Sequence, residues 1–407
     1  ADKLRVEDGY NPNAWYRMLA AKNVNYELDK GFNPALKPAA VEYGIVLSDS
    51  ADKTVQFAAK EFQKYIAIST GRFIPVITGP DSGDRAVVTV GVNVNDSFSE
   101  SAGEDDYVIR SNDNELVLSG ATSRATLYSV YHFLEKYMGC RWYFPDPDEE
   151  IVPEHKISKL GDIMAGDIDG SFSPAMEYRD LMVLNTDTLV ENDHMNPGWK
   201  PFGTQVPPER QRRWLKNELV RTVYKIDWMA KNRYNTVCLE GAYAGMRIFP
   251  ENWDLMQTMF PEVSKRGLHM GLSGHFWTPF LNTETPGWPD DNSWGNFSNG
   301  EFHPVTLSSR TYFCTTNYDA LEAFLSNIVS FYRTNPEFDI WSNWPPDSSP
   351  CCNCPTCRMF SDSVLNLVIH NQIAEALETE AQNSGKHIKV ILLGYAHLTQ
   401  PPDEDIK

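Results

Sequence analysis

Hydrophobic and polar positions follow two periodicities along this chain, and their order predicts an α/β protein. Residues 52–69 repeat apolar side chains at helical spacing, with Val55, Phe62 and Ile66 on one face. A second helix is predicted at 123–137, where Gly139 is a suitable C-cap. Short β-branched runs predict strands at 40–47, 86–92, 106–110 and 115–119. This first part of the chain therefore reads as a compact α/β domain.

From residue 176 onward, predicted strands and helices alternate more regularly. Strands are expected at 176–184, 235–240, 268–273, 338–344 and 388–395, and helices at 209–231, 252–266, 319–333 and 361–381. Strand, helix, strand is the unit of a parallel sheet, so we predict the first five units of a (β/α)₈ barrel of the TIM type. Such a barrel is incomplete at Lys407, and further C-terminal barrel residues are expected. An open doubly wound sheet that ends here is the alternative.

A length of 407 residues favours two domains. We place an N-terminal α/β accessory domain at 1–165 and a catalytic TIM-like barrel at 170–407. A stretch of about thirty residues rich in Gly, Pro, Trp and Asn lies between the strand at 268–273 and the next helix. An irregular insertion of this length is usually functional or disordered.

The net charge of −19 argues against nucleic acid or an anionic membrane as a general partner. No apolar run reaches the roughly 20 residues of a membrane span. The chain starts at Ala1 without Met or a signal-peptide core, which suggests processing. A neutral or locally contacted substrate fits this charge better, and the partner that we expect is an oligo- or polysaccharide. The abundant loop tryptophans, such as Trp277 and Trp344, suit stacking on sugars or packing under loops.

The stretch 338–357 carries the clearest candidate chemistry. Its strand ends at Pro345 and Pro346, and Asp347 follows directly. In α/β barrels the loops at the strand carboxyl ends carry the reactive groups. Asp347 is therefore our first candidate for a catalytic acid, with a helix-capping or solvated aspartate as the alternative.

Three cysteines follow Asp347 with the spacing C-x-C-x-x-C, namely Cys352, Cys354 and Cys357. This spacing is typical of zinc sites, and His370 is a possible fourth ligand. Disulfides to Cys314 or Cys351, or free thiols, are equally compatible with the sequence. In each case we expect the cluster to brace the loop beside Asp347, and no cofactor is required for catalysis.

Three segments resemble known carbohydrate-active proteins. The first, AAKEFQKYIAISTG with YHFLEKYMGCRWYFPDPDEEIVP, resembles the accessory domain that precedes the barrel in α-glucuronidases and β-N-acetylhexosaminidases. The others, IDWMAKNRYNTVCLEG and WPPDSSPCCNCPTC with LLGYAHLTQPP, resemble a poorly characterised bacterial glycoside-hydrolase-like family related to them. The resemblance implies the two-domain fold given above and a periplasmic or extracellular location.

The same resemblance implies cleavage of a glycosidic bond. That reaction needs a carboxylic acid and usually a second carboxylate, for which Glu240 at the end of the second strand is the candidate. The alternatives for Glu240 are a hydrogen bond to sugar hydroxyls and a strand-end charge paired with an arginine. In the hexosaminidases an Asp-Glu pair ends the fourth strand, but no Glu follows Asp347 here. This departure argues against their substrate-assisted mechanism.

Further residues near the predicted strand ends are candidates for substrate binding. They are His275, Arg179, Trp344, Tyr395, His397 and Trp277. Arg179 suits a uronate carboxylate through a bidentate contact, or a buried structural ion pair. His275 and Tyr395 offer hydrogen bonds to hydroxyl groups, although a strand-end histidine is often structural.

We therefore expect a glycoside hydrolase acting on a glycan with uronic acid or N-acetylated sugars. The main alternative is a noncatalytic carbohydrate-binding protein on a degenerate glycosidase barrel. A metal-dependent enzyme that uses the cysteine cluster is a third possibility, and it requires an open coordination position on the metal.

Overall fold

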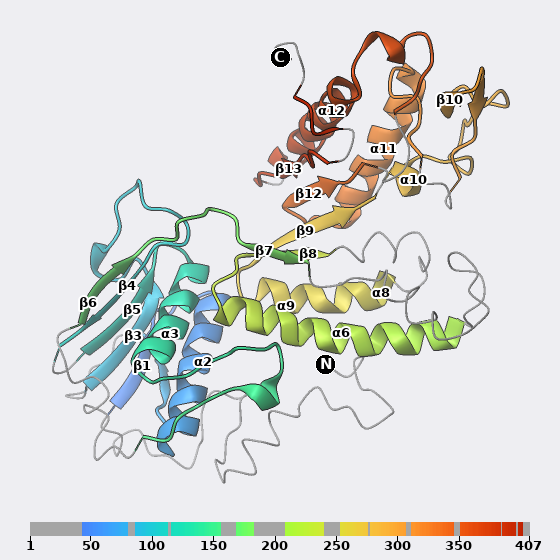
Figure 1. Cartoon of the computed structure of the whole chain (residues 1–407). Helices are drawn as coiled ribbons and strands as arrows, with labels where there is room; N and C mark the ends of the chain where they lie inside the picture. The colour runs from blue at the N-terminus through green and yellow to red at the C-terminus, as the bar shows by residue number, and fades with distance from the viewer. Residues whose placement is uncertain are drawn as a thin grey trace. The chain divides into compact units, whose positions relative to one another are not determined.

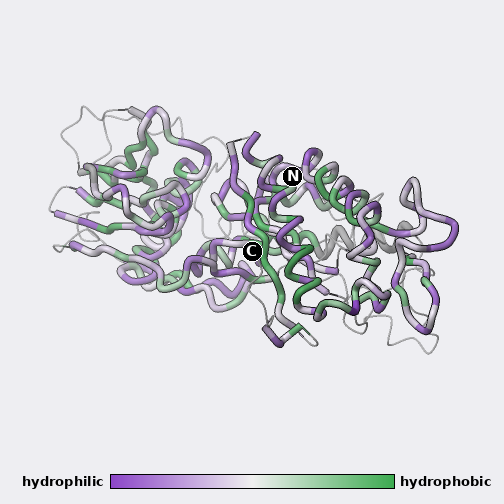
Figure 2. Tube along the Cα trace, turned by 90° about the horizontal axis from the view of Figure 1, so that it is seen from above, coloured by the Kyte–Doolittle hydropathy of each residue, from purple (hydrophilic) through white to green (hydrophobic). Residues whose placement is uncertain are grey.

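The computed structural model describes residues 43–79, 86–112, 115–155, 168–182, 208–239, 253–275, 277–306, 311–345, 351–383, 385–395 and 398–401. The chain divides into two compact units. The first unit comprises 1–181, 216–236 and 258–268, and the second comprises 182–215, 237–257 and 269–407. In the described part of the chain, Figure 2 shows hydrophobic segments bordered by hydrophilic ones, as expected of units that each bury a core.

The first unit is built on a six-stranded mixed sheet with the order β2-β1-β3-β5-β4-β6. Its strands are β1 (Tyr43–Leu47), β2 (Val76–Thr78), β3 (Ala86–Val92), β4 (Tyr107–Ser111), β5 (Glu115–Gly120) and β6 (Ile168–Phe172). Strand β1 runs parallel to β2 and β3, and β3 runs parallel to β5. Strand β4 is antiparallel to both β5 and β6. The predicted strands at 86–92, 106–110 and 115–119 are thus confirmed, whereas β2 and β6 were not predicted.

Two helices, α2 (Lys53–Thr70) and α3 (Ser123–Lys136), lie side by side against one face of this sheet (Figure 1). The Asp52 carboxylate caps α2 by accepting from the backbone N–H groups of Thr54 and Val55, both at 2.9 Å. Helix α2 ends at Gly71, whose φ of +70° is accessible to glycine at low cost. Helix α3 ends at Lys136 with Tyr137 as its C-cap, and Gly139 follows with a φ of +73°.

The second sheet has the order β13-β12-β9-β8-β7. It comprises β7 (Asp180–Met182), β8 (Thr236–Leu239), β9 (His269–Gly274), β12 (Ile340–Asn343) and β13 (Lys389–Ile391). Strand β12 pairs in parallel with β9 on one side and with β13 on the other. Neighbours in the sheet are also neighbours in the chain, as in the five units predicted. Among the described residues β7 and β13 are the edges of this sheet, so closure into a barrel is not confirmed.

Helices connect these strands, and irregular segments interrupt them. The α-helices are α6 (Pro208–Lys231), α8 (Trp253–Met256), α9 (Phe260–Ser264), α10 (Trp277–Phe280), α11 (Tyr318–Thr334) and α12 (Asp362–Gln382). Short 3₁₀ turns occupy Val94–Asp96, Pro147–Glu149, Gln257–Met259 and Cys357–Met359. The single helix predicted at 252–266 is wrong, because α8 and α9 are separated by a 3₁₀ turn and Pro261 lies in the first turn of α9.

The segment between β9 and α11, predicted to be irregular, contains a β-hairpin. Strands β10 (Asn296–Ser298) and β11 (Glu301–His303) pair antiparallel. Asn299 and Gly300 connect them with φ values of +54° and +91°, the left-handed conformation that a two-residue hairpin turn requires. This hairpin lies in the second unit and contributes to the site described next.

Candidate functional site

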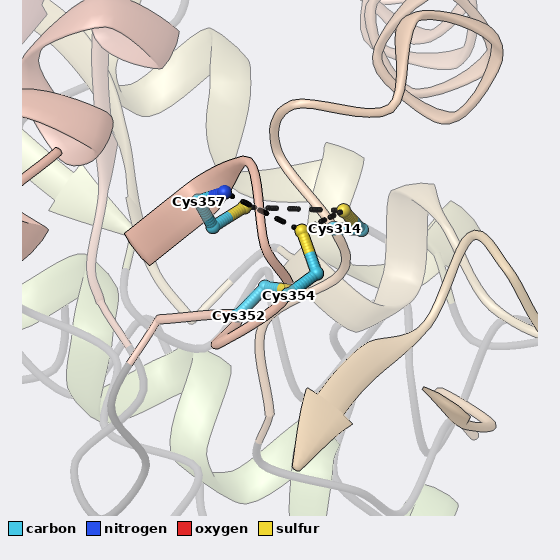
Figure 3. A group of neighbouring side chains, drawn as sticks. All are labelled: Cys314, Cys352, Cys354 and Cys357. Atoms are coloured by element: carbon cyan, nitrogen blue, oxygen red, sulfur yellow. Dashed lines mark hydrogen bonds between the residues drawn. The ribbon is translucent and has the colours of Figure 1, made fainter. Parts of the chain in front are cut away.

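Four buried cysteines converge in the second unit. They are Cys314, Cys352, Cys354 and Cys357, and their sulfur atoms all lie within 4.8 Å of one another. Cys314 comes from the segment before α11, whereas the other three precede α12 (Figure 3). The cluster therefore joins two segments that are far apart in the sequence.

Backbone hydrogen bonds fix each segment of the cluster. The Cys314 N–H donates to the Trp294 carbonyl at 2.9 Å, and the Cys314 carbonyl accepts from Asn317, the N-cap of α11. On the other segment, the Arg358 N–H donates to the Cys354 carbonyl at 3.0 Å and starts the 3₁₀ turn Cys357–Met359. The C-x-x-C spacing therefore forms a tight turn that brings Cys354 and Cys357 together.

The sulfur positions have the geometry of a metal centre. Cys314 Sγ lies 3.8 Å from Cys354 Sγ and 3.9 Å from Cys357 Sγ. Four sulfurs at about 2.3 Å from one tetrahedral zinc ion are about 3.8 Å apart. The S–S bond of a disulfide is about 2.05 Å long, which is much shorter than these sulfur–sulfur distances. The buried four-cysteine cluster is thus compatible with a structural zinc site.

Three polar groups lie at hydrogen-bonding distance from the sulfur atoms. The Phe297 N–H, from the β10–β11 hairpin, donates to Cys352 Sγ at 3.3 Å, and the Cys357 N–H donates to Cys354 Sγ at 3.4 Å. The Thr316 hydroxyl lies 3.1 Å from Cys357 Sγ. Such hydrogen bonds stabilise negative charge on thiolates and orient them as ligands.

The sulfurs also compete for protons with one another. Hydrogen bonds from Cys314 and Cys352 lower the pKa of Cys357 well below its usual value, and hydrogen bonding to Cys314 raises the pKa of Cys352. The thiolate of Cys357 is thus stabilised, whereas ionisation of Cys352 is disfavoured. A cation bound among the sulfurs removes that competition, because all four thiols can then ionise.

His370 does not belong to the cluster. It is buried on α12, with Nδ1 at 2.7 Å from the Asn366 carbonyl and Nε2 at 3.0 Å from the Asn343 carbonyl. Burial lowers its pKa. The interpretation of His370 as the fourth ligand is therefore wrong, because both ring nitrogens face backbone oxygens. The fourth position is taken by Cys314, which the sequence suggested only as a disulfide partner.

The neighbouring Cys351 is buried but also lies outside the group of four. Its Sγ contacts the Asp362 carbonyl at 3.9 Å, and burial raises the pKa of its thiol. Two adjacent cysteines thus have different surroundings.

Two of the predicted substrate-binding residues lie together at the end of the parallel strands. The rings of His275, after β9, and Trp344, after β12, meet edge to face with centroids 5.6 Å apart. The Trp344 N–H donates to the Gly274 carbonyl at 2.8 Å, which continues the pairing of β12 with β9. Both side chains are half-buried.

Trp277 occupies a different environment. Only 1% of it is exposed, and it packs against Tyr312, Phe313 and Phe324. Its indole N–H donates to the Trp344 carbonyl at 2.9 Å. Trp277 is therefore a core residue whose ring has no exposed face for a sugar. Of the two roles left open by the sequence, this is the packing role.

Tyr395 lies after β13 and is 42% exposed. A cavity of about 220 Å³ lies between the segment after β13 and the first turns of α12. The residues that line it include Asn366, Leu392, Gly394 and Leu398. Pockets for drug-sized ligands measure roughly 300–1,000 Å³, so this cavity alone suits a small group rather than an oligosaccharide.

Arg179 lies in the first unit, where its guanidinium has several protein partners. Nη2 donates to Asp105 Oδ2 at 2.6 Å, Nε to the Arg233 carbonyl at 2.8 Å and Nη1 to the Met176 carbonyl at 2.6 Å. This is the buried ion pair given above as the alternative to a uronate contact. Asp347, Glu240 and His397 lie outside the described residues.

Comparisons with known proteins give a structural likeness only. No protein-family model matches the chain, and no curated protein matches it. Its structure is similar to a 4-O-methyl-α-glucuronidase of family GH115 with specificity for decorated arabinogalactans, at 12% identity and a TM-score of 0.49 over 88% of this chain. It is also similar to a GH138 enzyme that targets pectin rhamnogalacturonan II, at 11% identity and a TM-score of 0.48 over 84% of this chain. The chain spans 43% of the length of each. Similarity at this level does not assign an activity.

Proposed function

We propose that this chain is part of a glycoside hydrolase whose reactive groups lie at the carboxyl ends of the second sheet. The observation that supports the proposal most is the parallel register of β9 and β12, which pairs Gly274 with Asn343 at the ends of the two strands. Parallel strands place their carboxyl ends at one edge, and enzymes with such sheets assemble their sites there.

The residues that follow these strands in the sequence suit glycan chemistry. Glu240 directly follows β8, His275 directly follows β9, and Asp347 comes four residues after β12. We assign Asp347 as the acid that protonates the leaving oxygen and Glu240 as the second carboxylate. His275 and Trp344 provide a hydrogen-bonding ring beside a flat apolar ring, a combination suited to a sugar.

The test is a screen of aryl glycosides and oligosaccharides that contain uronic acid or N-acetylated sugars, with the native chain and with Asp347→Asn. We expect kcat for a cleaved substrate to fall about 100- to 10,000-fold in the variant, because general acid catalysis is lost. Glu240→Gln is expected to reduce kcat by a similar factor. Asp319→Asn, a change at an exposed position in the first turn of α11, is the matched control and should leave the rate unchanged.

Equal kcat for the native chain and Asp347→Asn would remove the acid role from Asp347. Sugar binding without turnover by either protein would instead support the alternative, a noncatalytic carbohydrate-binding protein.

A further inference from the structure

We propose that Cys314, Cys352, Cys354 and Cys357 bind one zinc ion in a closed, purely structural site. Each sulfur supplies one ligand, and the sulfur separations of 3.8 and 3.9 Å fit the edges of a zinc tetrathiolate tetrahedron. Four protein ligands complete the coordination of zinc, so no position remains for water or substrate. This inference is independent of the proposed hydrolase activity.

The choice of metal follows from the ligands. Thiolate sulfur favours zinc, copper(I) or iron–sulfur chemistry over magnesium or calcium, and four sulfurs in a tetrahedron favour zinc or iron. The four cysteines are buried. Zinc suits a purely structural role at such a site because it has no redox chemistry and does not oxidise its own thiolate ligands. Binding releases four protons, since Zn²⁺ and four Cys–SH groups give a Zn(S–Cys)₄ centre of charge −2 and four H⁺.

The protein around the site is suited to that negative charge. The N–H groups of Phe297 and Cys357 donate to two of the sulfurs, and the Thr316 hydroxyl lies beside a third. These groups spread the charge over the surrounding backbone without adding a competing ligand. A cluster of thiols assembled only for hydrophobic packing has no need of such donors.

The site connects three segments of the second unit. Cys314 belongs to the segment before α11, and the other three ligands belong to the segment between β12 and α12. The β10–β11 hairpin joins them, because the Asn353 N–H donates to the Phe297 carbonyl at 3.0 Å. Zinc at this point would hold the loop that follows β12 without occupying the strand ends themselves.

The first test measures the metal and the thiols of the full chain purified under non-reducing conditions. We expect about one zinc per chain by elemental analysis, and seven titratable thiols after denaturation with a chelator, because none of the seven cysteines forms a disulfide in the structure. Fewer than seven thiols without metal would show disulfides, and seven thiols without metal would show free cysteines. Iron in place of zinc, or either of these results, would overturn the proposal.

The second test uses adjacent cysteines as a matched pair. Cys352→Ser should reduce zinc at least 10-fold, whereas Cys351→Ser should leave the zinc content unchanged, since Cys351 lies outside the group of four. Cys314→Ser should behave as Cys352→Ser, and His370→Gln as Cys351→Ser. Loss of zinc in His370→Gln with retention in Cys314→Ser would replace the proposed ligand set.

A third measurement does not depend on any variant folding. Cobalt(II) exchanged into the native chain should show thiolate-to-cobalt charge transfer in the near ultraviolet and the visible bands of a tetrahedral sulfur site. A six-coordinate spectrum without thiolate bands would overturn the closed four-sulfur site even if the chain bound one metal ion.

Discussion

The two units of this protein are stabilised by different means. In the first unit, buried charges neutralise one another: Asp105 lies between Arg124 and Arg179 at 2.6 Å from each, and buried Lys231 pairs with Glu150 and Asp227. In the second unit, the long segment between β9 and β12 contains a hairpin and an aromatic core, and it contributes Cys314 to a cluster of four sulfurs. In the first unit the buried charges are balanced by neighbouring side chains, whereas the sulfur cluster of the second unit is suited to binding a metal ion.

This difference bears on where function lies. Buried and paired charged groups, like Asp105 and Arg124, have their hydrogen-bonding capacity occupied by the protein, and so does the partly buried Arg179. Long loops that follow parallel strands have less regular backbone to hold them, and binding residues are found disproportionately on such loops. A metal that braces the loops gives them a fixed position without a large apolar core.

The largest expected effect is that of removing zinc. A ligand present at about 1,000 times its Kd stabilises the folded state by about 4 kcal/mol, so a strong chelator should destabilise the second unit by about that amount. Hydrogen exchange followed by mass spectrometry should show faster exchange in α11, α12 and the β10–β11 hairpin. Peptides from α2 and α3 are the internal control and should exchange at unchanged rates.

Equal acceleration in both units would contradict the distinction between them, because it would make the ion necessary for the whole chain. No acceleration anywhere would mean that the sulfur cluster contributes no stability through a metal.

The second prediction concerns Asp105. Replacing it by alanine leaves two buried guanidinium groups without their shared partner, which costs about 3 kcal/mol, the lower end of the range for a broken buried pair. The lower end is expected because Arg124 keeps a contact with Glu104 at 3.0 Å. Urea unfolding measures the change, and zinc content should stay constant. Asp169→Ala is the control: this carboxylate pairs with Arg110 at the surface and its loss should change the stability by less than about 0.5 kcal/mol.

The same carboxylate predicts a pH dependence. Burial alone raises the pKa of Asp105, but the Arg124 charge and the hydrogen bonds from Arg124, Arg179 and Asn235 outweigh it, so the pKa lies below its usual value. A lowered folded-state pKa gives stability that is present above the unfolded pKa and is lost as the pH falls through the folded pKa. Native stability should therefore decrease below about pH 4, and it should decrease less steeply in Asp105→Asn. If stability fell equally steeply below about pH 4 in the native chain and in Asp105→Asn, Asp105 would not be the source of this pH dependence.

Much of the fold was predictable because long periodic segments determine their own structure. Helices α2, α3, α11 and α12 lie within a residue or two of their predicted ranges, since each has an apolar face and a capping residue at its start. The strand β2 was missed because it has only three residues, and β6 was missed because its Asp169, Gly170 and Ser171 are not typical strand residues. The hairpin was missed although Asn299-Gly300, the strongest local signal for its turn, is plain in the sequence.

The candidate site was predictable only in part, because spacing reports local neighbours. Cys352, Cys354 and Cys357 could be grouped from their C-x-C-x-x-C pattern. Cys314 is far away in the sequence, and only the folding of α11 against α12 brings it to the cluster. Composition alone could not show whether the loop tryptophans stack on sugars or pack under loops, because that depends on whether each ring is buried. The roles of Asp347 and Glu240 stay predictions.

The third prediction tests the role of Trp277. Trp277→Phe removes part of a buried ring and its hydrogen bond to the Trp344 carbonyl, so we expect a loss of about 2 kcal/mol in the free energy of unfolding. Glycan binding, measured well below the unfolding transition, should be nearly unchanged. Trp288→Phe, a change at a half-buried indole bonded to Asn292, is the control with a smaller stability loss. Lost binding without lost stability would return Trp277 to the sugar-stacking role.

The smallest effects are expected at the helix N-caps, where in each unit a side-chain oxygen accepts from a backbone N–H group. Asp52 caps α2 in the first unit, and the Ser361 hydroxyl accepts from the Val364 N–H to cap α12 in the second. Each alanine substitution should cost about 1 kcal/mol and accelerate hydrogen exchange chiefly in its own helix. Because α12 follows the cysteine segment directly, the effect of Ser361→Ala should increase after zinc is removed, whereas that of Asp52→Ala should not. Equal effects with and without zinc would mean that the metal and the start of α12 contribute to stability independently.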